Sequence, residues 1–137
     1  MAAPVLVDTV YLVALIDPRD ALHAVALALA RKLAKRRVRL VTSDAVLIEL
    51  GNYFARSPLR STAADWIQAI RSAEGWDVVA LDRPVVSSAE SRYRTHADKN
   101  WSMTDCIIME VMDARGMRDI ATTDHGFEQA GYRLLLP

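Results

Sequence analysis

Residues 5–16 read VLVDTVYLVALI, and this stretch decides the fold that we expect. The β-branched and aliphatic residues at 4–7 predict a short buried strand that ends abruptly at Asp8. An apolar helix is expected to follow over residues 9–16, where Asp17 and Pro18 stop it. A buried strand that leads at once into a helix indicates the first unit of an α/β protein.

Strands and helices are expected to alternate along the rest of the chain. Apolar spacing and capping residues predict helices over residues 20–37, 45–56, 63–73, 84–96, 104–115 and, as a single turn, 127–130. Further strands are expected over residues 38–41, 77–81, 120–122 and 132–136. This alternation predicts a three-layer α/β/α sandwich with a mostly parallel central sheet. We see no repeat or linker, so we expect a single domain over residues 1–137.

The composition is that of an ordinary globular protein. The chain is 52% apolar and 25% charged, and its 17 basic residues balance its 17 acidic ones, so no overall positive field indicates nucleic acid. One cysteine can form neither an intramolecular disulfide nor a zinc cluster, which fits a reducing, cytoplasmic setting. We expect a soluble protein, because the start of the chain lacks a basic leader and the apolar runs are shorter than the roughly 20 residues that span a bilayer.

Four acidic residues occur where the predicted sheet would present a site. Asp8 and Asp124 directly follow predicted strands, and ligands bind outside the carboxyl ends of parallel strands. Glu49 lies one turn into the helix that leaves the second strand, and Asp105 lies in the first turn of a helix that Ser102 caps. Both stand among apolar neighbours in sequence, where a carboxylate must be paired, neutralised or bound to metal. We therefore expect the four carboxylates to converge.

Clustered carboxylates are the ligands that hard divalent cations such as Mg²⁺ prefer. Two such ions about 4 Å apart can activate water and stabilise the leaving oxygen in phosphodiester hydrolysis. The hydroxyl groups of Thr9, Ser102, Thr122 and Thr123 lie beside three of the acids and are expected to orient them. The sequence therefore predicts in-line hydrolysis without a covalent intermediate, since no serine or cysteine is paired with a base.

Each acid except Glu49 also has a purely structural explanation. Asp8 and Asp124 could cap the helices that follow them, and Asp105 could complete a capping box with Ser102. Coincidence of all four at one predicted edge favours a single site. Phosphate contacts could come from two basic groups, namely residues 31–37 and the set Arg92, Arg94, His96 and Lys99.

Four segments resemble the PIN-domain family, and within it the toxin ribonucleases of VapBC toxin–antitoxin modules. They are VLVDTVYLVAL at 5–15, TSDAVLIELGNYF at 42–54, WSMTDCIIMEVM at 101–112 and ATTDHGFEQAGYRLL at 121–135. The resemblance covers essentially the whole chain and implies a PIN fold with Mg²⁺- or Mn²⁺-dependent endoribonuclease activity. It further implies an RNA substrate, an antitoxin that blocks the site, and a homodimer.

The resemblance also assigns residues. Asp8, Glu49, Asp105 and Asp124 match the family's four acidic positions, the first three as the most direct metal ligands, and Thr9 and Thr122 match hydroxyl positions beside them. Two alternatives stay open, namely an RNA-processing PIN nuclease outside toxin–antitoxin systems and a catalytically silent RNA- or protein-binding module. An aspartyl-phosphate on Asp8 is disfavoured, because the common phosphatase version places a second acid where this chain has Val10.

Overall fold

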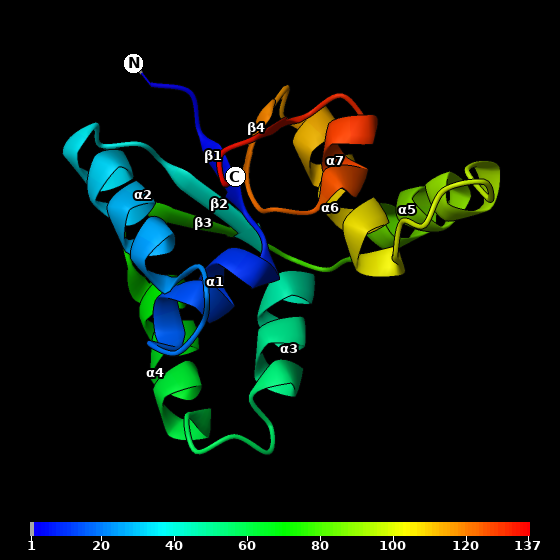
Figure 1. Ribbon diagram of the computed structural model, residues 1–137. Coiled ribbons are helices and arrows are strands. Elements are labelled where there is room, and N and C mark those ends of the chain that lie inside the picture. Colours follow the sequence, from blue (N-terminus) through cyan, green and yellow to red (C-terminus); the bar gives the residue numbers. More distant parts are fainter. Residues whose placement is uncertain (1) are drawn as a thin grey trace.

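The computed structural model describes residues 2–137 (Figure 1). Its strands are β1 (Val5–Val7), β2 (Leu40–Ser43), β3 (Trp76–Val79), β4 (Asp119–Ala121) and β5 (Arg133–Leu134). Its helices are α1 (Thr9–Ile16), α2 (His23–Lys35), α3 (Asp44–Tyr53), α4 (Arg60–Ser72), α5 (Arg83–Thr95), α6 (Met103–Ala114) and α7 (His125–Gln129). Every predicted helix and strand is present, so the alternating α/β pattern is confirmed.

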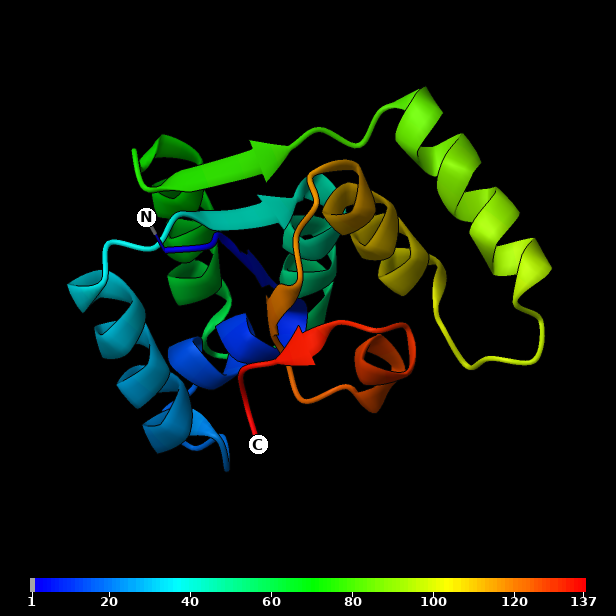
Figure 2. The ribbon, with the colours of Figure 1, turned by 90° about the horizontal axis from the view of Figure 1, so that it is seen from above.

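The strands form one parallel sheet in the order β3-β2-β1-β4-β5. The central strand β1 pairs with β2 through Val5 and Leu40 and with β4 through Leu6 and Ile120. Figure 2 shows β2 and β3 side by side and pointing the same way, as their parallel pairing requires. Because all strands run in one direction, their carboxyl ends meet at one edge of the sheet, and the residues that follow β1 and β4 lie next to each other.

Helices cover the sheet on both faces, which confirms the predicted three-layer sandwich. On one side α1 contacts α2, α3 and α4, and Figure 1 shows α1, α3 and α4 below the strands. On the other side α6 contacts β2 and pairs with α5, which extends outward to the right of the molecule. The pair of α5 and α6 therefore forms an arm beside the carboxyl edge of the sheet.

The core is centred on β1 and α1. Val5, Leu6 and Val7 are buried, and α1 is buried on nearly every side, which explains why its sequence is apolar almost without interruption. No helix in residues 2–137 combines the length and apolar character that a membrane span needs. The packing of β1 and α1 fixes Asp8, the residue between them, at the centre of the sheet's edge.

Some predicted boundaries were wrong by two or three residues. Helix α2 begins at His23 instead of Asp20, because the Asp20 carboxylate accepts a hydrogen bond from the Leu22 amide in a preceding turn at 2.9 Å. Strand β2 begins at Leu40 instead of Val38, since the Val38 amide still donates to the Leu33 carbonyl at 3.0 Å to close the helix. Arg37 makes this reversal with a positive φ of 53°.

Candidate active site at the carboxyl edge of the sheet

A cavity of about 550 Å³ opens where β1 and β4 end. All four predicted acids line it, and they come from four separate places in the fold, namely Asp8 before α1, Glu49 on α3, Asp105 on α6 and Asp124 before α7. The predicted hydroxyl residues Thr9, Ser102 and Thr123 also line the cavity. Of the described residues in its wall, none is Lys, Arg or His, so no side-chain cation neutralises the acids there.

Asp8 is the most constrained of the four carboxylates. Its Oδ1 accepts a hydrogen bond from the Thr9 amide and its Oδ2 accepts one from the Thr122 hydroxyl, both at 2.8 Å. The side chain is buried, with 7% of its surface exposed. The pKa of Asp8 is raised from 3.8 to about 6, chiefly by burial and to a smaller extent by the charges of Asp105 and Glu49, while the two hydrogen bonds oppose the rise.

Thr122 couples Asp8 to Asp124. Its hydroxyl donates to Asp8 and accepts a hydrogen bond from the Asp124 amide at 3.2 Å. The Asp124 Oδ1 in turn accepts from the Gly126 amide at 2.8 Å, which caps α7. Gly126 fits closely here, because a Cβ added to it would lie 3.1 Å from both Asp124 Oδ1 and Trp101 Cδ1.

Asp105 is held by the start of α6. It forms a capping box with Ser102, in which the Asp105 Oδ2 accepts from the Ser102 amide at 2.9 Å and the Ser102 hydroxyl accepts from the Asp105 amide at 3.0 Å. Burial raises the pKa of Asp105, and the charges of Asp124 and Glu49 add to that effect. The capping roles considered for Asp8, Asp105 and Asp124 are thus all present, and they aim the carboxylates at the cavity without excluding a site.

Glu49 lines the cavity from the exposed side of α3 and not from the apolar surroundings that its sequence neighbours predict. The prediction of apolar surroundings was wrong, because Val46, Leu47 and Leu50 face the core while Glu49 is on the exposed side of α3. Its Oε1 accepts a hydrogen bond from the Thr9 hydroxyl, the residue next to Asp8. The hydroxyl of Thr9 therefore ties Glu49 to the centre of the site.

Two further residues line the cavity that sequence reasoning did not place there. They are Asp20, the first residue of the helix predicted over residues 20–37, and Tyr53, to which the sequence pattern assigns no role. Asp20 does accept a hydrogen bond from the Leu22 amide, as a capping residue would, and it also adds a fifth carboxylate to the wall. No sequence signal marks it, since it follows no strand and only the turn between α1 and α2 brings it to this edge.

The two predicted basic groups have different places. Arg92 is not available for phosphate, because its guanidinium is paired with Glu110 at 2.6 Å and with Asp113 on α6. Arg94, His96 and Lys99 instead line a second cavity beside Ser102. Residues 31–37 include the last turn of α2 and the turn that leads to β2. They therefore lie at the amino edge of the sheet, opposite to the edge that carries the acids.

The donor chemistry of the site fits a divalent cation. Mg²⁺ and Mn²⁺ prefer hard anionic ligands such as carboxylate oxygens. The described wall of this cavity has no basic side chain beside its carboxylates, and the pKa values of two of them, Asp8 and Asp105, are raised. Within residues 2–137, no three His, Cys, Asp or Glu side chains are spaced to hold one ion together as they stand. The fit therefore rests on the kind and charge of the donors around the cavity, and the assignment of each acid as a ligand stays a prediction.

A parallel α/β sandwich with a carboxylate-lined cavity at the carboxyl edge of its sheet is the class of protein that the fold and the site define. The PIN-domain model matches residues 5–131, and the chain belongs to this family. The predicted resemblance is confirmed. No curated protein matches the chain in sequence.

Solved structures show the same fold. VapC20 from Mycobacterium tuberculosis, described as a Sarcin-Ricin loop cleaving toxin, superposes with a TM-score of 0.83 at 25% identity over 97% of this chain and 99% of that one. VapBC2 from Rickettsia felis, bound to a DNA fragment from their promoter, gives 0.67 at 14% identity over 94% and 95% of the two chains. FitAcB from Neisseria gonorrhoeae gives 0.66 at 17% identity over 95% of each chain. The last two are similar in fold alone.

Proposed function

We propose that this protein is a Mg²⁺- or Mn²⁺-dependent endoribonuclease and the toxin of a toxin–antitoxin module. The observation that carries the proposal is the convergence of Asp8, Glu49, Asp105 and Asp124 on one cavity whose described wall has no basic side chain. Membership of the PIN family and the likeness to the toxin VapC20 support a ribonuclease of the toxin class.

In this proposal the four carboxylates hold the cation, and the hydroxyls of Thr9 and Thr122 fix the orientation of Glu49 and Asp8. A divalent cation supplies Lewis-acid chemistry for phosphodiester hydrolysis, polarising phosphate oxygens and lowering the pKa of water. The protein's own groups bind and orient and do not attack. The Ser102 hydroxyl caps α6 and Cys106 is buried, so neither has the neighbouring base that a nucleophile needs.

The same comparisons support a proposal for the substrate and the partner. VapC20 cleaves the Sarcin-Ricin loop, which favours a structured RNA as the substrate of this protein. Several of the similar structures are toxin–antitoxin complexes, so we propose a small antitoxin that covers the acidic cavity and a homodimeric toxin. Co-expression with the product of a short neighbouring reading frame should yield a complex without nuclease activity, and expression of the protein alone should arrest growth.

Cleavage of end-labelled RNA by the purified protein tests the proposed activity. We expect cleavage in MgCl₂ or MnCl₂ and none in EDTA. Asp105→Asn should be inactive, whereas Asp119→Asn, which removes an acid at the other edge of the sheet, should cleave like the wild type. Cleavage that persists in EDTA or in Asp105→Asn would overturn the proposal.

A further inference from the structure

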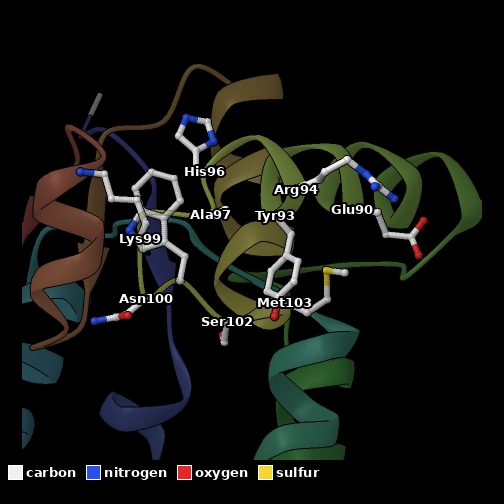
Figure 3. A pocket seen from close by; sticks show the side chains of 10 residues that line it. Glu90, Tyr93, Arg94, His96, Ala97, Lys99, Asn100, Ser102 and Met103 are labelled. Carbon is white, nitrogen blue, oxygen red and sulfur yellow. The ribbon is translucent and has the colours of Figure 1, made fainter.

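A second and larger cavity adjoins the acidic one. It has a volume of about 970 Å³ and lies between the end of α5, the loop over residues 96–102 and the start of α6 (Figure 3). We call it the α5–α6 cavity. Ser102 lines both cavities, so the two meet at the N-terminus of α6. The nuclease function proposed above gives this larger cavity no role.

The lining of the α5–α6 cavity is opposite in charge to that of the acidic cavity. Arg94, His96 and Lys99 line it, against a single acid, Glu90. Among the described residues Arg94 makes no ion pair, and Lys99 makes only a long one of 3.8 Å with Asp98, whose side chain is 75% exposed. Exposed pairs of this kind are weak. The cations are therefore available to an anionic ligand.

An aromatic side chain stands beside these cations. Tyr93 is 53% exposed, and Figure 3 shows its ring below α5 beside Met103 and Ser102, with the Arg94 side chain extending to the right. A tyrosine that is half exposed beside a cavity has a ring face that can stack on a planar ligand. Cations next to an exposed aromatic ring are the combination that single-stranded nucleic acid selects, phosphates contacting the cations and bases stacking on the ring.

Contacts around the α5–α6 cavity fix the end of α5 and the loop that follows it, even when no ligand is bound. Arg92 ties α5 to α6 through Glu110 at 2.6 Å and through Asp113, and its carbonyl lies 3.0 Å from the His96 Nδ1. His96 packs on the buried Trp101, with ring centroids 4.9 Å apart. Arg92, His96 and Trp101 thus form a rigid support, and a preordered cavity loses less entropy when it binds a ligand.

We propose that the α5–α6 cavity binds an unpaired nucleotide of the RNA substrate next to the scissile phosphate, with Tyr93 stacking on its base and Arg94 and Lys99 contacting backbone phosphates. The inference rests on the proposed nuclease function. The α5–α6 cavity also supplies basic side chains, which the described wall of the acidic cavity lacks, to attract a polyanion toward the site. Tyr and Arg are common in protein interfaces as well, so the argument for a polyanion rests on Lys99, because lysine is depleted in such interfaces and common in phosphate contacts.

Fluorescence anisotropy with a short labelled single-stranded RNA tests this subsite. The titrations use Asp105→Asn as the background in MgCl₂, so that the RNA stays intact during binding. In that background Tyr93→Ala should weaken binding about tenfold, as expected from loss of one base stack. Tyr93→Phe keeps the ring and should bind as tightly as the background protein.

A charge-matched pair of variants tests the phosphate contacts. Arg94→Ala with Lys99→Ala should weaken binding about tenfold and reduce the slope of log affinity against log salt by about 1.4, from about 0.7 for each lost contact to single-stranded phosphate. Arg31→Ala with Lys35→Ala removes the same charge from α2 at the other edge of the sheet and should leave affinity and slope unchanged. Equal losses in the two double variants would mean a general charge effect and would overturn the subsite.

Two further outcomes separate this inference from the nuclease proposal. If Tyr93→Ala and the Arg94 and Lys99 pair bind RNA like their background but lower the self-association of the protein in sedimentation, the cavity is a contact between copies and the subsite is wrong. If the binding pattern holds while the wild type fails to cleave RNA in MnCl₂, the subsite stands and the nuclease proposal fails.

Discussion

Within residues 2–137, acidic side chains at the amino edge of the sheet are paired with arginine, whereas the acids of the cavity at the carboxyl edge are not. At the amino edge Asp77 is paired with Arg39 at 2.6 Å and Arg115 at 3.3 Å, and Asp119 is paired with Arg133 at 2.9 Å. At the carboxyl edge Asp8, Glu49, Asp105 and Asp124 face a cavity wall without basic residues. The pairing with Arg39 lowers the pKa of Asp77, whereas burial raises the pKa of Asp8 to about 6.

The chain can thus neutralise its acids with arginine, and it does so even for Asp44, which follows β2 at the carboxyl edge and is paired with Arg71 at 2.7 Å, but not for the acids of the cavity's described wall. Clustered carboxylates that lack cations repel one another and lower the stability of the fold. A site that keeps such repulsion needs a cation from solution to relieve it. The acids of the amino edge therefore serve as internal controls for the acids of the cavity.

The largest effect is expected on catalysis. Asp105→Asn should reduce the initial rate of metal-dependent RNA cleavage at least about 100-fold, since even the residues that orient metal ligands cost about 10- to 100-fold when they are removed. Asp77→Asn removes an acid from the amino edge and should cleave at the wild-type rate. Equal rates for Asp105→Asn and the wild type would remove Asp105 from the site.

The next effect concerns stability and its dependence on pH. The pKa of Asp8 is raised from 3.8 to about 6, so the Asp8 carboxylate binds a proton more tightly in the folded protein than in the unfolded chain. Metal-free protein should therefore lose stability as the pH rises from 3.8 to about 6, by about 3 kcal/mol in total from this group. Urea unfolding at a series of pH values in EDTA measures this loss.

At the amino edge of the sheet the stability is expected to change with pH in the opposite direction. The pKa of Asp77 is lowered, so its contribution to stability is present at neutral pH and is lost as the pH falls. In EDTA, Asp8→Asn should lack the share of the stability loss between pH 4 and 6 that comes from Asp8, and at neutral pH Asp77→Asn should be less stable than the wild type. MnCl₂ should stabilise the wild type and not Asp8→Asn. A wild-type stability that stays constant between pH 4 and 6 would contradict the raised pKa of Asp8.

A moderate effect is expected from the threonine that joins two of the acids. Thr122→Val removes the hydroxyl that donates to Asp8 at 2.8 Å and accepts from the Asp124 amide, and should reduce the cleavage rate by about 10- to 100-fold. Thr42→Val is the matched control, because Thr42 on β2 is equally buried but donates to the Val7 carbonyl. Similar rate losses in both variants would indicate a general packing defect.

The smallest effect is expected at Gly126. A Cβ placed there would lie 3.1 Å from Asp124 Oδ1, so Gly126→Ala should displace the Asp124 carboxylate and lower the cleavage rate a few-fold. Gly51→Ala on α3 is the control, since its Cβ would meet only Ile67 at 3.9 Å. We expect no loss of rate there. Equal cleavage rates for the wild type and Gly126→Ala would show that catalysis does not depend on the exact position of the Asp124 carboxylate.

The fold could be predicted because apolar spacing, capping residues and β-branched runs mark its strands and helices clearly. The run from Val5 to Ile16 carries the buried strand, the acid and the helix in order, and the structure has each of them. The boundary of β2 could not be predicted, because it depends on the positive φ of Arg37 and on the hydrogen bond from Val38 to Leu33, neither of which has a sequence signature such as glycine.

The site was predictable where acids follow strands and less so elsewhere. Asp8 and Asp124 follow β1 and β4, so the parallel sheet itself brings them together. Glu49 was predicted for the wrong reason, since its helical face is exposed while its sequence neighbours are buried. Asp20 and Tyr53 were missed, because their place in the cavity depends on how α1, α2 and α3 pack against one another.

The central claim is that the carboxyl edge of the sheet holds divalent cations and the amino edge does not. Anomalous diffraction from crystals grown with MnCl₂ tests it most directly. We predict anomalous peaks between the carboxylates of Asp8 and Asp105, with Glu49 or Asp124 beside them, and no peak at Asp77 or Asp119. Crystals that diffract well but have no manganese in the acidic cavity, or manganese only at the amino edge, would contradict it.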